Sequence, residues 1–174
     1  MRLFWFLRFL IYSSFVNATG WLGYIGRPIF IKGCRKIFIG RDFRLFPGAR
    51  LEVVGEGRLT IGDYFRCGQN LFVTCSNENV SIGNFCIFSA NVFIGTQKND
   101  FSKRARDKDW FKTGVTEHSV SIGDRCFLGY GAVILPGTVL GDGCVVGANA
   151  VVSGVYLENS VIAVPKAVEI GRLN

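Results

Sequence analysis

The sequence predicts an all-β fold, a triangular prism of short parallel strands, with a short helical segment before it. An aliphatic side chain recurs every six residues without a break, at Ile122, Leu128, Ile134, Leu140, Val146 and Val152. Glycine directly follows four of them, at Gly123, Gly129, Gly141 and Gly147. Four residues after the first five comes a small side chain, at Cys126, Ala132, Thr138, Cys144 and Ala150. A period of six fits neither a 3.6-residue helix nor one long strand.

The period fits short strands joined by tight corners, with one aliphatic residue per strand pointing inward and glycine at the corners. Earlier stretches repeat the pattern less regularly, at Ile39, Leu45 and Leu51, at Ile61, Cys67 and Val73, and at Ile82, Phe88 and Ile94. The stretches begin at residues 39, 61, 82, 122 and 140, and the last spacing of 18 equals three strands. A coil of three strands is triangular, and its inward ladders account for part of the 16 Phe.

The repeat divides the chain into three parts: an apolar segment over residues 1–26, the prism over 27–165 and a tail over 166–174. The spacing of 40 residues between the stretches at 82 and 122 implies an excursion of about 22 residues, which we place at 98–119. The excursion is highly charged and holds the only His. Long excursions from compact folds are commonly functional. The alternative is a solvated loop or a loop that packs between subunits.

The N-terminal segment is apolar from Leu3 to Val16, apart from Arg8 and two serines. This stretch is too short to cross a bilayer, which takes about 20 residues. One interpretation is a helix of residues 1–16 lying in the membrane interface, with Arg2 and Arg8 near lipid phosphates. The other is a helix packed on the protein's own core or on a neighbouring subunit. A signal peptide is a third interpretation, which Arg8 inside the apolar stretch disfavours.

The composition describes one ordinary domain of 174 residues with a net charge of +7. The positive charge favours a membrane surface. Nucleic acid is not expected, because no binding motif accompanies the basic residues. A single His excludes a multi-His metal site, and we expect no metal. No two cysteines form a Cys-x-x-Cys pair, so a zinc knuckle or redox motif is not expected. Because Cys126 and Cys144 occupy the small position of the repeat, we expect unpaired core thiols in the reducing cytoplasm rather than the disulfides of a secreted protein, at Cys34, Cys67, Cys75, Cys86, Cys126 and Cys144.

These motifs resemble a known family. Residues 39–165 are similar to the left-handed parallel β-helix, hexapeptide-repeat acyltransferases, above all the polysaccharide O-acetyltransferases and the maltose and galactoside acetyltransferases. The stretch IGDRCFLGYGAVILPGTVLGDGCVVGANAVVSG (122–154) looks like the final two coils of the family, and VIAVPKAV (161–168) looks like its closing turn. The resemblance implies a homotrimer with active sites between subunits, and acetyl-CoA as the acyl donor along the last coils.

The resemblance also implies a donor site and an acceptor site. Ala148 lies where the backbone of the family's alanine meets the pantetheine arm, and Ser153 lies where a hydroxyl contacts CoA. Gly129 and Tyr130 line the same groove, and Lys166 in the closing turn could meet CoA phosphates. On the acceptor side the candidates are Asn70 and Asn91, of which Asn70 could equally be a corner residue.

The catalytic base of the family is a His that follows the Asn-Val-x-Ile strand. Here that strand is residues 91–94, and the expected positions hold Gln97 and Asn99, neither of which is a base at neutral pH. His118, at the end of the excursion, is the remaining candidate for a relocated general base. The alternative is a surface His at a strand entry.

The sequence therefore predicts an acetyl-CoA-dependent O-acetyltransferase acting on a sugar hydroxyl of a surface-polysaccharide or lipid-linked glycan precursor, in the cytoplasm and in contact with the membrane if the N-terminal segment binds lipid. Two alternatives stay open. The absence of His from its usual position would suit a catalytically silent scaffold in polysaccharide assembly. It would also suit an N-acetyltransferase on an amino sugar, because an amine needs a weaker base.

Overall fold

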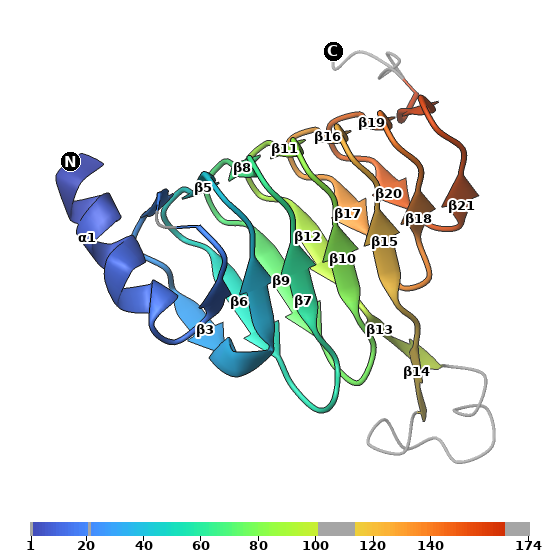
Figure 1. The fold of residues 1–174 in the computed structure, drawn as a ribbon. Coiled ribbons are helices and arrows are strands. Elements are labelled where there is room, and N and C mark those ends of the chain that lie inside the picture. Colours follow the sequence, from blue (N-terminus) through green and yellow to red (C-terminus); the bar gives the residue numbers. More distant parts are fainter. Residues whose placement is uncertain (1, 21, 101–113, 166–174) are drawn as a thin grey trace, which may run out of the picture.

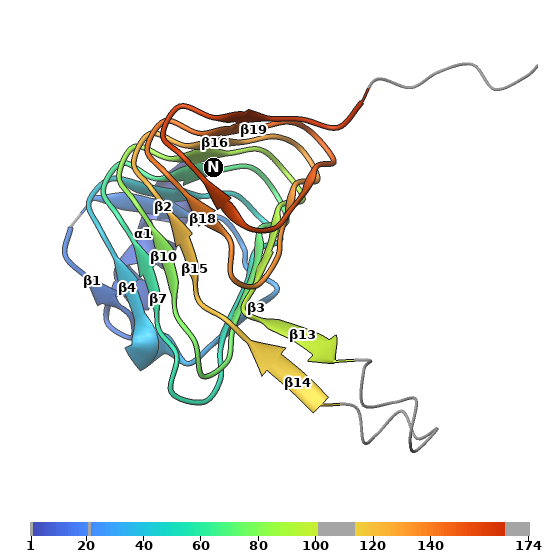
Figure 2. The same ribbon diagram turned by 90° about the vertical axis from the view of Figure 1, so that its right-hand side faces the viewer.

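The chain folds into a parallel β-helix that is closed at its N-terminal end by one helix. The computed structural model describes residues 2–20, 22–100 and 114–165. Figure 1 shows the coils stacked side by side, from helix α1 (Arg2–Ser13) at the N-terminal end to the last strands at the other end. Figure 2, along the stack, shows the rounded triangular outline of the coils. The predicted prism is confirmed.

Three parallel sheets form the sides of the prism in the described part of the chain, and each coil contributes one strand to each sheet, except that the last coil has none in sheet C. Sheet A contains β1 (Asn17–Ala18), β4 (Ile37–Ile39), β7 (Leu59–Ile61), β10 (Val80–Ile82), β15 (Val120–Ile122), β18 (Val139–Leu140) and β21 (Val155–Tyr156). Sheet B contains β2 (Gly23–Ile25), β5 (Phe43–Leu45), β8 (Arg66–Cys67), β11 (Ile87–Phe88), β16 (Phe127–Leu128), β19 (Val145–Val146) and β22 (Val161–Ile162). Sheet C contains β3 (Phe30–Lys32), β6 (Arg50–Val53), β9 (Phe72–Cys75), β12 (Phe93–Gly95), β17 (Val133–Ile134) and β20 (Val151–Val152).

The core consists of the residues that the six-residue period selects. The six aliphatic residues from Ile122 to Val152 are each no more than 2% exposed, and they lie one per strand. Parallel pairing in register aligns them with their copies in neighbouring coils, as in Ile82 opposite both Ile61 and Ile122. Phe43 stacks on Phe65 at 5.6 Å, which confirms an inward aromatic ladder. Burial of these ladders supplies the main driving force for the fold.

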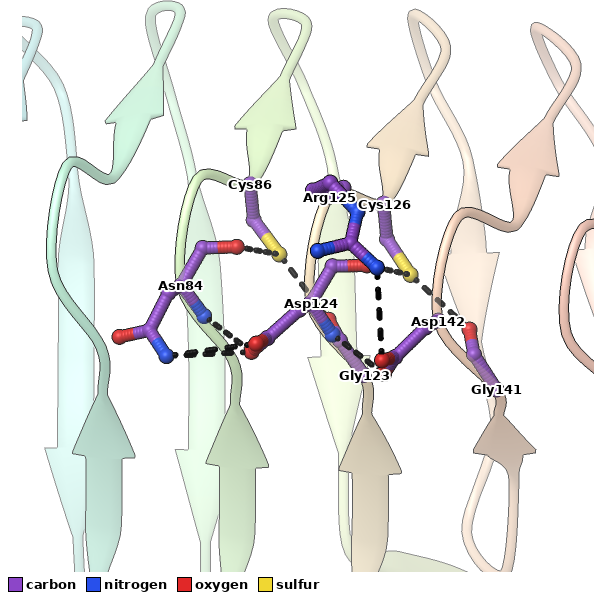
Figure 3. Close-up of polar contacts among 8 residues, drawn as sticks. All are labelled: Asn84, Cys86, Gly123, Asp124, Arg125, Cys126, Gly141 and Asp142. Atoms are coloured by element: carbon purple, nitrogen blue, oxygen red, sulfur yellow. Dashed lines mark hydrogen bonds and ion pairs between the residues drawn. The ribbon is translucent and has the colours of Figure 1, made fainter.

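The corner between sheets A and B is held by a ladder of polar side chains (Figure 3). Asp124 Oδ1 accepts a hydrogen bond from the backbone N–H of Asn84 at 2.7 Å, and Asp142 Oδ1 accepts one from the backbone N–H of Asp124 at 2.9 Å. Each carboxylate thus satisfies a backbone donor of the preceding coil, which the tight corner leaves without a strand partner. Asp63 continues the ladder and forms an ion pair with Arg41 at 2.6 Å, which lowers the pKa of the Asp63 carboxyl.

Thiols occupy the small inward position beside this ladder. Cys86 and Cys126 donate to the carbonyls of Gly123 and Gly141, at 3.2 and 3.3 Å. All six cysteines are free, and five of them are buried, while Cys34 is partly exposed. The prediction that the thiols are unpaired is confirmed for all six cysteines. The prediction that they lie in the core is confirmed for the five buried ones and is wrong for Cys34. Burial raises the pKa of Cys67 and of Cys75 to about 12.

The irregular spacings of the repeat all fall at the corner between sheets C and A. The extra residues lie in the loops 54–58 and 76–79 of two successive coils, and the excursion leaves from the same corner of the next coil. Its described arms are β13 (Gln97–Asp100) and β14 (Gly114–Glu117), which pair antiparallel. Figure 2 shows this hairpin projecting away from the prism. Residues 101–113 of the predicted excursion lie outside the described residues.

The first coil begins at Asn17, earlier than the boundary at residue 27 placed from the sequence. β1 and β2 lack the six-residue spacing, but they join sheets A and B through backbone pairing with β4 and β5. Helix α1 packs on β2, with Phe9 fully buried against Gly23, where even a Cβ would overlap the Phe9 ring. No helix within the described ranges has the length and apolarity that a membrane crossing requires.

Candidate active site

The base of the β13–β14 hairpin places the only His on the surface of the prism. His118 follows β14 directly, and its backbone N–H donates to Thr96 O at 2.9 Å. Thr96 is fully buried and its Oγ1 accepts from the backbone N–H of Ser76 at 3.0 Å, so the hairpin base is anchored in the coil. The His118 side chain is exposed. It lies beside Gly137 of the next coil, where an added Cβ would come within 3.5 Å of His118 Cβ.

Glu117 binds the hairpin to the preceding coil. Its two oxygens accept hydrogen bonds from Gln97 Nε2 at 2.6 Å and from Asn77 Nδ2 at 2.9 Å. These donors, together with Ser76, hold the pKa of the Glu117 carboxyl below its ordinary value. Gln97 is one of the two positions, with Asn99, at which the resemblance implies the family's His, and here it anchors the hairpin. No hydrogen bond or ion pair joins Glu117 to His118 in the described part of the chain, so this carboxylate anchors the hairpin and does not contact the imidazole.

A second polar cluster runs along the corner between sheets B and C. Asn70 Nδ2 donates to Asn91 Oδ1 at 2.9 Å, and Asn91 Nδ2 donates to the Tyr130 hydroxyl at 2.5 Å. Asn70 and Asn91 have φ angles of 58° and 60°, in the left-handed region that Asn tolerates better than most residues. The backbone conformation alone therefore explains Asn at both positions. Their predicted acceptor role remains a prediction.

Three predicted donor-site residues, Gly129, Tyr130 and Ala148, lie at the same corner, in adjacent coils. A Cβ on Gly129 would lie 2.6 Å from the backbone nitrogen of Ala148, so only glycine permits this close stacking. The side chains of Ala148 and Tyr130 are exposed. Gly129 is thus buried beneath Ala148, whose small side chain is exposed at the same corner as the exposed ring of Tyr130.

The remaining predicted residues lie elsewhere. Ser153 is exposed at the corner between sheets C and A, the corner that also holds His118. Lys166 lies outside the described residues. The predicted site residues therefore divide between two corners, which lie at opposite ends of the strands of sheet C. Crossing that sheet takes about five residues, or roughly 16 Å of extended chain. No group of three or more potential ligand side chains in the described ranges could hold a metal ion.

Sequence reasoning missed the Glu117 network. The one signal available was the absence of His from its usual position, which left Gln97 free for another role. The partners Asn77 and Glu117 are 40 residues apart in the chain and meet only because two coils stack.

Comparison with known proteins identifies the family. The family model described as "Hexapeptide repeat of succinyl-transferase" matches residues 119–154. WbbJ of Escherichia coli K12, named as a lipopolysaccharide biosynthesis O-acetyl transferase, is 33% identical over 141 residues, which cover 78% of this chain and 71% of WbbJ. WcaF of the same organism, named as a colanic acid biosynthesis acetyltransferase, is 27% identical, and the match spans 64% of this chain and 56% of WcaF.

The fold has close structural neighbours as well. The crystal structure of AntD, an N-acyltransferase from Bacillus cereus in complex with dTDP and 3-hydroxybutyryl-CoA, superposes with a TM-score of 0.75 at 17% identity, covering 90% of this chain and 82% of AntD. The match confirms the predicted fold, left-handed coiling included. Sequence and fold agree: the chain belongs to the left-handed β-helix, hexapeptide-repeat acyltransferase family.

Proposed function

We propose that this protein is an acetyl-CoA-dependent O-acetyltransferase that modifies a sugar hydroxyl of a surface-polysaccharide or lipid-linked glycan precursor. The observation that supports the proposal most directly is the 33% identity to WbbJ, which extends over 71% of that protein. The structural neighbour AntD was crystallised with an acyl-CoA, which supports the same class of donor.

In the proposed reaction His118 removes the proton of the acceptor hydroxyl, and the oxygen attacks the thioester carbonyl. A backbone N–H of the donor groove stabilises the negative oxygen of the tetrahedral intermediate. Collapse of the intermediate breaks the C–S bond, leaves the acetyl group on the sugar and releases the CoA thiolate, which takes the proton from the imidazolium. His118 is exposed, and its neighbour in the next coil, Gly137, has no side chain.

The proposed site needs more than one copy of the chain. His118 and Ala148 lie at different corners, at opposite ends of the strands of sheet C. Neighbouring copies packed around a threefold axis would set the corner between sheets C and A of one copy, which carries His118, against the corner between sheets B and C of the next copy, which carries Ala148. We therefore propose a homotrimer with three sites between subunits. Light scattering of the purified protein should give three times the chain mass of 19.2 kDa.

An N-acyltransferase is the second candidate. The observation that favours it is Gln97 at the usual position of the family's catalytic base, since an amine acceptor needs less help in losing its proton. AntD is itself named as an N-acyltransferase. The catalytically silent scaffold is the third candidate, and it predicts no turnover of acetyl-CoA.

One experiment separates these functions. Acetyl-CoA binding is measured by calorimetry, and release of free CoA thiol is followed with matched hydroxy and amino sugars as acceptors. Thiol release with hydroxy sugars supports the O-acetyltransferase, release with amino sugars alone supports the N-acyltransferase, and binding without release supports the scaffold.

Ala148→Trp should abolish acetyl-CoA binding and leave the oligomer intact, whereas Glu158→Trp, at the exposed corner between sheets A and B, should bind normally. Unchanged affinity in Ala148→Trp would rule out the proposed donor groove.

We propose that the reaction takes place in the cytoplasm, where acetyl-CoA is available. Contact with the membrane is a separate question, and it depends on the N-terminal end of the prism.

A further inference from the structure

Helix α1 has a second apolar face that nothing in the described structure covers. One face packs on the first coil through Phe9 and Tyr12. The opposite face carries Leu3, Phe4, Leu7, Leu10 and Ile11, which are 66%, 69%, 46%, 41% and 62% exposed. These positions follow the spacing of a single helix face. An isolated exposed Leu is ordinary, but five large apolar side chains on one face indicate a binding surface.

The net charge of the protein is concentrated at the same end. Residues 1–41 contain seven Lys and Arg and no Asp or Glu, whereas residues 42–174 contain 13 of each kind, so the first 41 residues account for the whole net charge of +7. Three of the seven are exposed on the first coil or in the turn after it: Arg27, Lys32 and Arg35. None of these three forms an ion pair with a carboxylate of the described residues.

We propose that the N-terminal end of the prism, formed by the open face of α1 and these basic residues, docks on a lipid bilayer that contains anionic lipids. An interfacial helix buries its apolar face among the acyl chains, and nearby Lys and Arg bind the head groups. A second copy of the chain is the other candidate occupant. Charge complementarity disfavours it, because two such ends would bring together three exposed basic residues from each copy, none of which has a carboxylate partner among the described residues.

The docking places the rest of the molecule relative to the membrane. In sheet A the strand that follows His118, β15, is separated from the terminal strand β1 by β4, β7 and β10. Four spacings of about 4.8 Å put His118 roughly 20 Å from the end coil. Figure 1 shows α1 at one end of the stack and the hairpin base well along it. If the proposed function holds, His118 would face the sugars of a lipid-linked acceptor rather than the bilayer surface. The docking itself does not depend on that function.

Vesicle sedimentation tests the docking directly. The full-length protein is mixed with vesicles of phosphatidylcholine alone or with added phosphatidylglycerol. We expect binding to the anionic vesicles that weakens as salt is added. Replacing Arg27, Lys32 and Arg35 together with Ser should reduce the affinity roughly a hundredfold, at about fivefold per residue. The matched control replaces Arg58 and Arg125, which lie on later coils, and Lys98, which lies in the hairpin, and should have little effect.

A second pair of variants tests the helix face. The triple variant Phe4→Ser, Leu7→Ser, Ile11→Ser should lose vesicle binding, and its far-UV circular dichroism should show that the β-helix is intact. The matched control Val155→Ser, Leu157→Ser, Val161→Ser removes equally exposed apolar residues at the opposite end of the prism, where they are 73%, 79% and 75% exposed, and should bind as the wild type does.

Three results would overturn the proposal. They are failure of the wild type to bind anionic vesicles, equal binding by the helix variant and the wild type, and lipid-free association that the helix variant abolishes. The last result would assign the face to a second copy. The vesicle experiments measure lipid binding and do not depend on acetyl transfer. The docking and the proposed function are therefore tested by different measurements, and either one can fail without the other.

Discussion

Gln97 Nε2 donates a hydrogen bond to Glu117 Oε1 at 2.6 Å, joining the first residue of β13 to the last residue of β14. The bond closes the hairpin immediately before His118. Asn77 of the preceding coil donates to the other oxygen of Glu117, so the carboxylate links three segments of the chain. The only His therefore follows a network in which Gln97, one of the two positions where the resemblance implies the family's base, is a structural donor.

Acid should release the hairpin from the prism. Hydrogen bonds from Gln97, Asn77 and Ser76 lower the pKa of Glu117 from its ordinary value of 4.5. A group whose pKa is lower in the folded state contributes stability that is complete above the unfolded value and is lost as the pH falls through the folded value. Hydrogen exchange of residues 114–117, corrected for intrinsic rates, should therefore accelerate below pH 4.5 relative to the amides of β15. Glu117→Gln should remove this pH step, and a step that persists in the variant would contradict the assignment.

The corner ladder in Figure 3 predicts a difference between two substitutions at one position. Asp124→Ala removes the acceptor of the backbone N–H of Asn84 and should lower the free energy of unfolding by about 1–2 kcal/mol. Asp124→Asn keeps an oxygen in the same place and should cost less than half as much. Urea denaturation gives both values. Equal losses would mean that the charge matters more than the backbone contact.

The two faces of α1 should respond differently to the same substitution. Phe9 is fully buried and Phe4 is 69% exposed on the opposite face. Phe9→Ala should lower the free energy of unfolding by about 3 kcal/mol, because it leaves a cavity between the helix and β2. Phe4→Ala should change it by less than about 0.5 kcal/mol in the absence of lipid. Urea denaturation in lipid-free buffer measures both variants, and a large loss in Phe4→Ala would indicate that a partner already covers that face.

Thiol reagents should distinguish the cysteines by burial. Five of the six are buried and Cys34 is partly exposed. In the native protein a disulfide-exchange reagent at pH 8 should modify Cys34 quickly, and the other five should react only after denaturation. Cys34→Ser should abolish the fast phase. Burial raises the pKa of Cys67 and Cys75 to about 12, so these thiols stay protonated as well as inaccessible. A second fast thiol would show that the core opens.

The coil of the prism was predictable from the sequence because its geometry repeats. One inward residue in every six must be apolar, so Leu128 and Ile134 identify strands without knowledge of their neighbours. The first coil was not identified, because Asn17 and Ala18 join sheet A through backbone pairing, which leaves no side-chain pattern. The hairpin arms were recognised only as a break in the period, since an antiparallel pair outside the core has no reason to carry the repeat.

The site was predictable only in part, for a related reason. Spacing identified Gly129 as a corner glycine, whose close approach to Ala148 forbids a side chain, and the resemblance alone implied its place in the donor site. It could not place Glu117 against Asn77, because contacts between coils depend on how many residues each corner contains. It also left open which face of α1 was buried, since both faces are apolar and only the position of β2 distinguishes them.

We propose that this protein transfers an acetyl group with His118 as the base. This is tested by measuring kcat/KM for CoA thiol release with a hydroxy sugar, for the wild type and for His118→Asn, which keeps the side chain polar and of similar size. We expect a loss of about 10²- to 10⁴-fold with acetyl-CoA affinity unchanged. Equal kcat/KM in the two proteins would remove His118 from the mechanism, and no thiol release from the wild type with any acceptor would contradict the transferase itself.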